Sequence, residues 1–282
     1  MKTDRNNRIK SKISWAIATL FALFALLVSI LPFFYMILNS FKNRFEMLME
    51  GIFTLPNKLD LSNYKELLSG GFIGYFINSV LLLVISLVLI LVISACASYP
   101  LARFKFKLRN PLYAIIIACM AIPIHVTLIP VFKMSQTLRI YDSLLALIGP
   151  NVAFALPVSV FILTGFMASI ETEIEEAAQI DGCNKYQMFY RIMFPLAKPG
   201  LATLAIYNGV NIWNEFIFAN TLTQSAEHRT LPLAVWDYQG QYVMNTPMIM
   251  AVLTLTLLPM LVFFAFAQEK LVKGMTAGAV KG

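Results

Sequence analysis

The sequence contains little charge for its length. Only 13% of its 282 residues are Asp, Glu, Lys or Arg, whereas 59% are hydrophobic and the mean hydropathy is +0.72. Soluble globular domains usually carry about 25% charged residues. The composition therefore excludes an ordinary soluble domain and predicts a protein that resides in a lipid bilayer.

The sequence also lacks paired cysteines and recognisable catalytic motifs. Cys96, Cys119 and Cys183 show no paired spacing, so neither a disulfide framework nor a metal site is indicated. His-Glu-x-x-His, Gly-x-Ser-x-Gly and paired intramembrane aspartates are missing. We therefore expect a protein that is not an enzyme and binds no cofactor.

One glycine pattern resembles a nucleotide-binding loop only superficially. Gly274 and Gly278 are followed by Lys281 and Gly282. A phosphate-binding loop needs four residues between its glycines and then Gly-Lys-Ser/Thr. We expect no nucleotide site in this chain, so energy from ATP would have to come from a separate ATPase subunit.

Six apolar runs are long enough to cross a membrane, since each helical crossing needs about 20 apolar residues. They are Ser14 to Leu38, Ile73 to Leu101, Pro111 to Phe132, Leu144 to Ala168, Gly200 to Leu222 and Pro247 to Ala267. Six crossings place both termini on the same side of the membrane. The predicted fold class is an all-α polytopic membrane protein.

The distribution of positive charge predicts which side that is. With the N-terminus inside, the inner segments hold 15 of the 22 Lys and Arg residues, and the outer loops hold seven. Lys and Arg collect in cytoplasmic loops, so both termini are expected in the cytoplasm. The net charge of +7 then reflects topology and contact with anionic membrane lipids, and no nucleic acid partner is expected.

The basic N-terminus could instead indicate a secretory signal peptide. The apolar run that follows it, Ser14 to Leu38, is too long for a typical signal core, and no Ala-x-Ala-like cleavage site follows. We therefore expect a first membrane helix. The stretch Asn39 to Phe72 contains several glycines and one proline, so it is predicted to be an outer connector with one short surface helix.

Five prolines lie inside the predicted spans, at Pro123, Pro130, Pro150, Pro157 and Pro259. Each removes a backbone hydrogen bond and can bend its helix, which leaves room for a cavity. Prolines are also tolerated in membrane helices without any such role. The sequence leaves both interpretations open.

A polar segment between two apolar runs carries the strongest local pattern. Thr172 and Glu175 are spaced as a capping box, and Gly182 is expected to end the first of two short helices. Asn184 can cap the second helix, which Pro195 should end.

Each of these two helices has a predicted face. The first should present a small flat surface made of Ile174, Ala177 and Ala178, and the second an aromatic one made of Tyr186, Phe189, Tyr190 and Met193. A small surface beside the Glu176 carboxylate allows another protein with a basic residue to approach closely. The alternative is a solvated helical hairpin whose acids only complement the helix dipole.

The full spacing of this segment resembles the cytoplasmic EAA loop of membrane subunits in binding-protein-dependent ABC importers. The resemblance rests on Glu176-Ala177-Ala178-Gln179-Ile180-Asp181-Gly182, followed by Phe189, Ile192 and Pro195. Phe194 departs from the Leu that the family often has before the proline. The resemblance implies an ATPase-docking set of Glu175, Glu176, Ala177, Ala178, Asp181, Gly182, Phe189, Ile192 and Pro195.

Two further stretches are similar to carbohydrate importers of the maltose type. They are Trp213-Asn214-Glu215-Phe216 with Leu231-Pro232-Leu233, and the tail from Val272 to Gly282. The resemblance implies the type I ABC importer permease (MetI-like) fold. It also implies three regions: residues 1–71 with the first helix, a membrane domain at 72–268 with its EAA loop at 170–199, and a cytoplasmic tail at 269–282.

The resemblance further implies an assembly in the cytoplasmic membrane of a prokaryote. Its other members would be a homologous second permease, two ATPase subunits that hold ATP and magnesium, and an extracytoplasmic sugar-binding protein. Two rivals remain open. One is the same architecture with another cargo, such as glycerol-3-phosphate, a polyol or an amino acid, and the other is a transporter or scaffold without an ATPase.

The fifth apolar run contains most of the polar residues that lie inside the spans. At about 100° per residue, Asn208, Asn211 and Glu215 fall within a narrow arc, beside Tyr207 and Asn214. Amides, a carboxylate and an aromatic ring suit a sugar, so these five residues are the candidate substrate pathway. Hydrogen bonds between helices are an equally weighted alternative.

The charged and polar residues in the spans limit which classes of cargo and which energy sources are expected. The spans contain no Lys or Arg, which favours a neutral cargo over a phosphorylated one. Glu215 is their single acid, which disfavours coupling to protons or sodium ions. Packing roles are expected for the isolated Asn151 and His125, and Asn78 is expected to cap or anchor its helix.

Overall fold

The computed structural model describes the backbone of residues 2–238 and 244–279, and side chains within 12–236 and 244–265. Every regular element in those ranges is a helix, which confirms the all-α fold class. The chain divides into two compact units, Met1–Gly70 with Val235–Leu257, and Gly71–Ala234 with Leu258–Gly282. The whole tail pattern at Val272 to Gly282 lies outside the residues whose side chains are described.

The first unit contains a long helix followed by a small folded connector. Its helices are α1 (Lys2–Ser40), α2 (Arg44–Glu50), α3 (Ser62–Ser69) and the start of α14 (Thr246–Ala279), with the 3-10 turn η4 (Val235–Tyr238). The predicted connector contains two short helices instead of one. The second was missed because α3 begins at Ser62 without a side-chain cap that the sequence could reveal.

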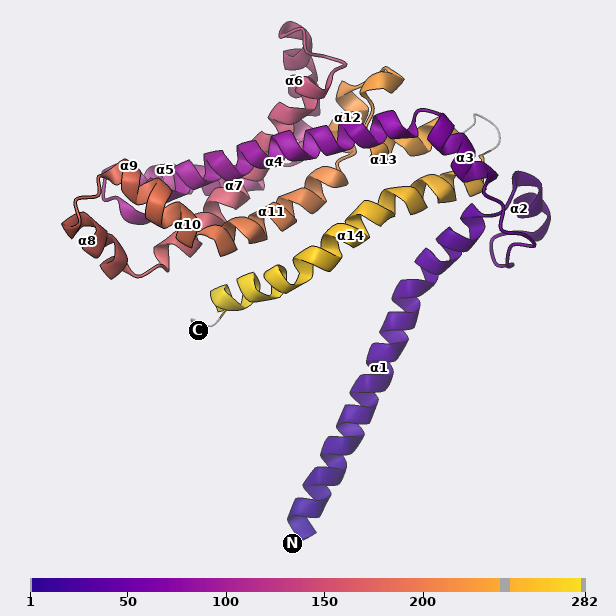
Figure 1. Ribbon diagram of the computed structural model, residues 1–282, viewed down its shortest axis with the longest axis horizontal. Coiled ribbons are helices and arrows are strands. Elements are labelled where there is room, and N and C mark those ends of the chain that lie inside the picture. The colour runs from indigo at the N-terminus through magenta and orange to yellow at the C-terminus, as the bar shows by residue number, and fades with distance from the viewer. Residues whose placement is uncertain (1, 239–243, 280–282) are drawn as a thin grey trace. The chain divides into compact units, whose positions relative to one another are not determined.

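The second unit is built around three packed helices, α4 (Phe72–Arg103), α7 (Leu144–Ala168) and α11 (Lys198–Trp213) (Figure 1). Its other helices are α5 (Arg109–Ala118), η1 (Cys119–Ala121), α6 (Ile124–Thr137), α8 (Thr172–Ile180), α9 (Lys185–Gln187), the π-helical η2 (Met188–Met193), α10 (Phe194–Leu196), α12 (Ile217–Leu222), η3 (Ala226–His228) and α13 (Leu231–Ala234). The short helices α8 to α10 gather at one end of the three long ones.

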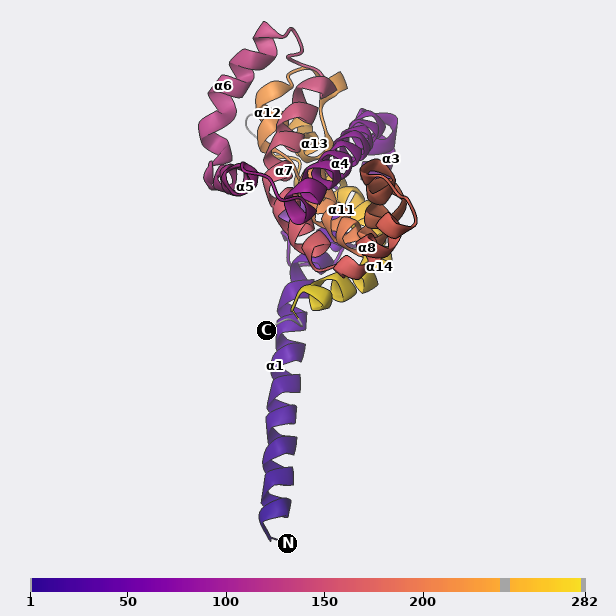
Figure 2. The ribbon, with the colours of Figure 1, turned by 90° about the vertical axis from the view of Figure 1, so that its left-hand side faces the viewer.

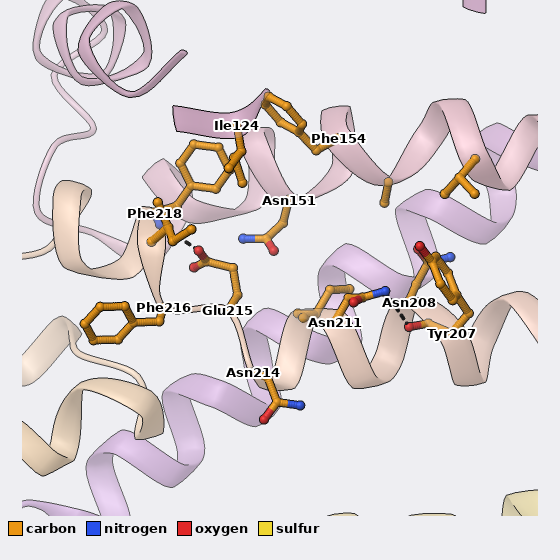
Figure 3. Close-up of a pocket in the computed structure, with 14 residues that line it drawn as sticks. Ile124, Asn151, Phe154, Tyr207, Asn208, Asn211, Asn214, Glu215, Phe216 and Phe218 are labelled. Atoms are coloured by element: carbon orange, nitrogen blue, oxygen red, sulfur yellow. Dashed lines mark hydrogen bonds between the residues drawn. The ribbon is translucent and has the colours of Figure 1, made fainter. Parts of the chain in front are cut away.

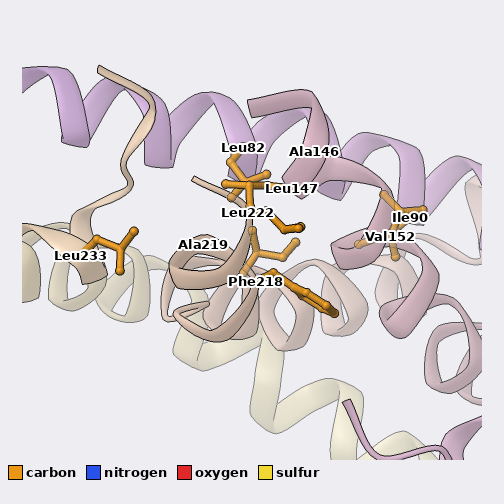
Figure 4. Close-up of a cluster of buried hydrophobic side chains, with 10 residues drawn as sticks. Leu82, Ile90, Ala146, Leu147, Val152, Phe218, Ala219, Leu222 and Leu233 are labelled. Carbon is orange, nitrogen blue, oxygen red and sulfur yellow. The ribbon is translucent and has the colours of Figure 1, made fainter. Parts of the chain in front are cut away.

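Small side chains allow α4 and α7 to pack closely. Ser86, Ser94 and Ser98 of α4 are fully buried, and the Ser98 hydroxyl donates a hydrogen bond to the Val160 carbonyl at 3.3 Å. Small residues let helix backbones approach one another, which is how membrane helices gain packing without a hydrophobic driving force. A cluster that includes Leu82, Leu147 and Phe218 then fills the space between α4, α7 and α12 (Figure 4).

The structure confirms four of the six expected spans as single helices. Among the described residues, four helices are long and apolar enough to cross a membrane: Ser14–Ser40, Phe72–Arg103, Leu144–Ala168 and Thr246–Ala265. The third expected span is a pair of helices, α5 with η1 and then α6, bent by 98° (Figure 2). Pro123 lies at this bend, where its missing N–H and its extended backbone separate the two helices.

The prediction of one continuous helix from Gly200 to Leu222 is wrong. Helix α11 ends at Trp213 after 16 residues, and α12 begins at Ile217. Hydropathy does not register the break because both helices are apolar. The Glu215 carboxylate accepts hydrogen bonds from the amides of Phe218 and Ala219, so it satisfies the first turn of α12 and stabilises a new helix start.

Candidate functional site

The polar segment after α7 forms two helical stretches with a glycine corner, as predicted, but Pro195 does not end the second stretch because it lies within α10. The Asp181 amide bonds to the Ala177 carbonyl at 3.1 Å, and the Gly182 amide bonds to the Gln179 carbonyl at 3.0 Å. Gly182 has φ +84°, a left-handed conformation that costs glycine little and other residues more. Gly182 therefore turns the chain between α8 and α9.

The predicted capping box of Thr172 and Glu175 is wrong. Glu171 occupies the N-cap position of α8, and no side chain caps this helix. Glu175 turns toward α4 instead, where its Oε1 lies 2.6 Å from Nε of Arg103 and each side chain is 10% exposed. The Arg103 guanidinium also donates to the Ile170 carbonyl. Helix α8 is thus held against the end of α4.

Burial affects the protonation of Glu175. Desolvation raises the pKa of the Glu175 carboxyl, and the positive charge of Arg103 offsets part of that effect. The sequence did not predict Arg103 as the partner of Glu175, because the two residues are 72 positions apart. The only signal for Arg103 was its place as the first of four basic residues, Arg103 to Arg109, after an apolar run.

The predicted cap of the second helix is confirmed. The Asn184 side chain accepts from the Gln187 amide at 2.9 Å, and the Gln187 side chain accepts from the Asn184 amide at 2.9 Å. These two bonds form a reciprocal capping box at the start of α9. The following turn is then positioned directly after the glycine corner.

The predicted aromatic face is wrong for half of its residues. Tyr186 and Tyr190 are exposed, whereas Met193 is buried and Phe189 is partly buried beside Tyr99. The reason is that residues 188–193 are π-helical, so their angular spacing differs from the α-helical spacing that was assumed.

The nine residues of the predicted docking set fall into two groups. Glu176, Ala177, Asp181 and Gly182 are exposed, while the others are buried or partly buried: Glu175, Ala178, Phe189, Ile192 and Pro195. Of these five, Ala178, Phe189 and Ile192 belong to the apolar cluster beneath the loop. Ile180 was not predicted as part of the set, yet its side chain is 86% exposed at the end of α8. The first group forms part of the exposed surface of the loop.

A cavity of about 490 Å³ lies at the break between α11 and α12, with polar and apolar side chains in its wall (Figure 3). Its wall contains all five residues of the predicted substrate pathway, Tyr207, Asn208, Asn211, Asn214 and Glu215. Aromatic side chains complete the wall: Phe154, Phe216 and Phe218. The described lining includes no Lys or Arg.

The five residues differ in what their side chains do. Asn208 is buried, and its amide donates to the Ser159 hydroxyl at 3.0 Å and to the Leu204 carbonyl at 3.0 Å. Asn208 therefore forms a hydrogen bond between helices, as the alternative interpretation predicted. Tyr207, Asn211 and Asn214 are exposed, and the latter two each donate one bond to their own helix.

The position of Glu215 differs from the predicted helical arc. Because α11 ends at Trp213, Glu215 lies in the break, although its side chain still reaches the cavity wall (Figure 3). Its two carboxylate oxygens accept from the amides of Phe218 at 2.6 Å and Ala219 at 3.0 Å. A structural role at the start of α12 accounts for this carboxylate.

The remaining polar residues lie as follows. Asn151 is buried and bonds to the Leu147 carbonyl, so its packing role is confirmed, although it also lines the cavity. Asn78 donates to the carbonyls of Glu227 and Arg229, and so anchors the start of α4 as expected. His125 is exposed on α6, contrary to the packing role that was expected.

Sequence comparison identifies the family. Residues 90–277 match the family described as binding-protein-dependent transport system inner membrane component. A putative ABC transporter permease protein, ORF2, of Caldicellulosiruptor sp. (strain Rt8B.4) is 50% identical over 256 residues, which cover 91% of this chain and 93% of that protein. The melibiose/raffinose/stachyose import permease protein MelC of Bacillus subtilis (strain 168) is 32% identical, with 95% and 98% covered.

The fold of the chain also has solved counterparts. A chain of a bacterial ABC transporter involved in the import of the acidic polysaccharide alginate matches with a TM-score of 0.80 and 22% identity, over 94% of this chain and 97% of that one. The family match contains both the loop after α7 and the cavity at the α11 break. This chain belongs to the family of inner membrane components of binding-protein-dependent transport systems.

Proposed function

We propose that this chain is a permease subunit of an ATP-driven importer of sugars, oligosaccharides in particular. Relatives named for the transport of arabinooligosaccharides and of melibiose, raffinose and stachyose support this cargo. A second permease, two ATPase subunits and an extracytoplasmic sugar-binding protein complete the assembly. The chain itself catalyses no reaction, and ATP and magnesium bind to the ATPases.

The proposed topology has six crossings and cytoplasmic termini. Two of the crossings are interrupted, one by the bend at Pro123 and one by the break at Asn214 to Phe216. Non-helical backbone is tolerated at membrane depth only where protein or a water-filled cavity surrounds it. The cavity at the second break meets this requirement and supports a crossing that lines a pathway.

The observation that carries the proposal is the division of the loop into an exposed and an anchored face. Glu176 and Ala177 face outward on α8, while Glu175 on the same helix is paired with Arg103. A partner that binds the exposed face can therefore transmit force to α4 without an intervening flexible linker. Closure of the ATPases would move the loop and rock the permease between inward-facing and outward-facing states.

The cavity supports a neutral, hydroxyl-rich cargo. Asn211 and Asn214 carry amide groups that can pair with sugar hydroxyls, and Tyr207 can cover the apolar face of a sugar ring. All three are exposed in this chain, and a second permease could close the pathway around them. Asn208 and Glu215 hold the surrounding helices in place.

Reversing the charge of Glu176 tests the docking surface. We expect Glu176→Lys to abolish sugar uptake while ATP hydrolysis continues, because the basic partner residue would be repelled; Gly182→Pro should act likewise by disrupting the corner. Uptake and ATP hydrolysis would be measured on the copurified complex in liposomes. Glu66→Lys is the matched control, since Glu66 is also exposed but lies on α3. Parental uptake by Glu176→Lys would show that the loop has been assigned wrongly.

Removing one amide tests the pathway. We expect Asn211→Leu to lower sugar uptake at least tenfold without loss of complex assembly, because hydroxyl groups would lose a polar partner in the wall. Asn220→Leu is the control, since Asn220 is exposed on α12 and does not line the cavity. If both variants transport at the parental rate, Asn211 does not belong to the pathway.

Copurification separates this proposal from a transporter that works without an ATPase. The complex would be isolated through a tag on this chain under mild detergent conditions. A bound subunit that hydrolyses ATP supports the proposal. A chain that transports sugar alone in liposomes, with no such subunit, supports the rival.

A further inference from the structure

The connector between α1 and α4 buries two charged side chains and exposes several large apolar ones. Lys42 is 0% exposed and Glu46 is 8% exposed, whereas the exposed fractions of Phe45, Met49 and Phe53 are 72%, 71% and 76%. A soluble segment would show the reverse distribution. This inverted surface therefore needs an apolar environment.

The connector is held in a defined conformation, so its exposed apolar groups do not reflect a loose chain. The Lys42 ammonium donates to the Gly51 carbonyl and to the Thr54 hydroxyl, each at 2.8 Å. The Glu46 carboxylate accepts from the Asn57 amide at 2.6 Å. The Asn63 side chain donates to the carbonyls of Ser40 and Lys42, which ties α3 to the end of α1.

Helix α2 has one face for each environment. At about 100° per residue, Phe45, Leu48 and Met49 lie within one arc of roughly 100° and are all exposed. Glu46 and Met47 lie on the opposite side and are buried in the connector. The sequence of α2 is therefore amphipathic with its apolar face pointing outward from the chain.

Contacts with α1 fix the height of this apolar face along the axis of α1. The rings of Tyr35 and Phe53 meet edge to face with centroids 5.6 Å apart, and the Asn39 side chain donates to the Ile52 carbonyl at 3.0 Å. Tyr35 lies five residues before the end of the apolar helix Ser14–Ser40, a rise of about 7.5 Å. Phe53 is thus level with the last turns of that helix.

We propose that the connector lies on the outer leaflet of the membrane, with Phe45, Leu48, Met49 and Phe53 inserted between the lipid headgroups. None of the most apolar stretch of α1 is buried within the described chain, so lipid or a second membrane subunit has to cover the neighbouring surface. Interfacial helices bury Phe and Leu side chains at the boundary between acyl chains and headgroups, and the exposed Arg44 can reach lipid phosphates. The inference rests on α1 crossing the bilayer and is independent of cargo and ATPase.

Fluorescent labels at single cysteines test the position of the connector. Cys96, Cys119 and Cys183 are first replaced by Ser, and Leu48→Cys, Met49→Cys and Phe53→Cys are then labelled with a nitrobenzoxadiazole (NBD) probe in the copurified complex in phosphatidylcholine liposomes. We expect lipids with a nitroxide high on the acyl chain to quench each label at least twofold, and iodide to quench it weakly. Lys65→Cys, exposed on α3, is the control that iodide should quench strongly.

Two results would overturn the inference. One is quenching of the connector labels by iodide to the same extent as the Lys65→Cys label. The other is shielding that develops only when a sugar-binding protein is added, which would make the face a protein docking surface. A label at Leu27→Cys, in the middle of α1, separates the causes: if nitroxides deep in the bilayer fail to quench it, the topology itself is wrong.

Discussion

A buried ion pair connects α8 to the long helix α4. Arg103 lies at the end of α4 and Glu175 lies in α8, and each side chain is 10% exposed. Removing one partner of such a pair leaves the other charge buried without compensation, at a cost of about 3–5 kcal/mol. The pair therefore positions α8 and is not expected to touch the ATPase.

The effect of the Arg103–Glu175 pair should depend on pH, because the Glu175 carboxyl can be protonated. Because burial raises the pKa of Glu175 in the folded protein, protonation stabilises the fold, and that stabilisation is lost as pH rises through the folded pKa. We expect Arg103→Ala to uncouple ATP hydrolysis from uptake more severely as pH rises, since the unpaired carboxylate then ionises.

The neutral variant is the matched rescue. Adding Glu175→Gln to Arg103→Ala should restore much of the coupling at the pH values where Arg103→Ala is most uncoupled, measured as sugar molecules imported per ATP hydrolysed. A double variant that remains as uncoupled as Arg103→Ala at every pH would mean that the charge of Glu175 is not the cause.

At the scale of elements, hydropathy and capping predicted the uninterrupted helices well. The expected span Leu144 to Ala168 has the observed bounds of α7, and the expected span Ile73 to Leu101 lies within α4. Asn184 and Gly182 were also correctly assigned, because caps and positive φ angles depend on nearby residues. Features that depend on neighbouring residues can therefore be predicted from a single sequence.

The errors came from contacts between distant residues and from changes of helical geometry. Glu175 fits a local capping box, but Arg103 provides a stronger partner through the tertiary fold. The break after Trp213 is invisible to hydropathy, and the carboxylate that stabilises it could not be located before α12 was known. Tyr190 was placed wrongly because a π-helical turn cannot be recognised from apolar spacing.

The corner between α8 and α9 makes a prediction at this scale. Nothing lies within 4 Å of a Cβ built on Gly182, so Gly182→Ala introduces only the strain of φ +84°, about 1 kcal/mol. We expect a lower midpoint for thermal unfolding in detergent. Gly149→Ala is the control, because Gly149 has equal space inside α7 and alanine favours a helix. Equal midpoints for the two variants would contradict the strain.

At the scale of the whole molecule, the candidate site was predicted as a set of residues but not as a geometry. The cavity gathers all five predicted pathway residues, although α11 ends before Glu215. Within its wall the residues have different roles: Asn208 donates a hydrogen bond to Ser159, whereas Asn211 and Asn214 are exposed. Only the packing of α7 against α11 could make that distinction.

The central claim is that the exposed face of α8 contacts an ATPase. Ile180 is 86% exposed on this face, so a photoreactive amino acid placed there should crosslink to the subunit that hydrolyses ATP when the copurified complex is irradiated. The same amino acid at Leu48, on the connector before α3, should not. Crosslinks from position 180 only to lipid or to this chain, in a complex that still hydrolyses ATP, would contradict the account.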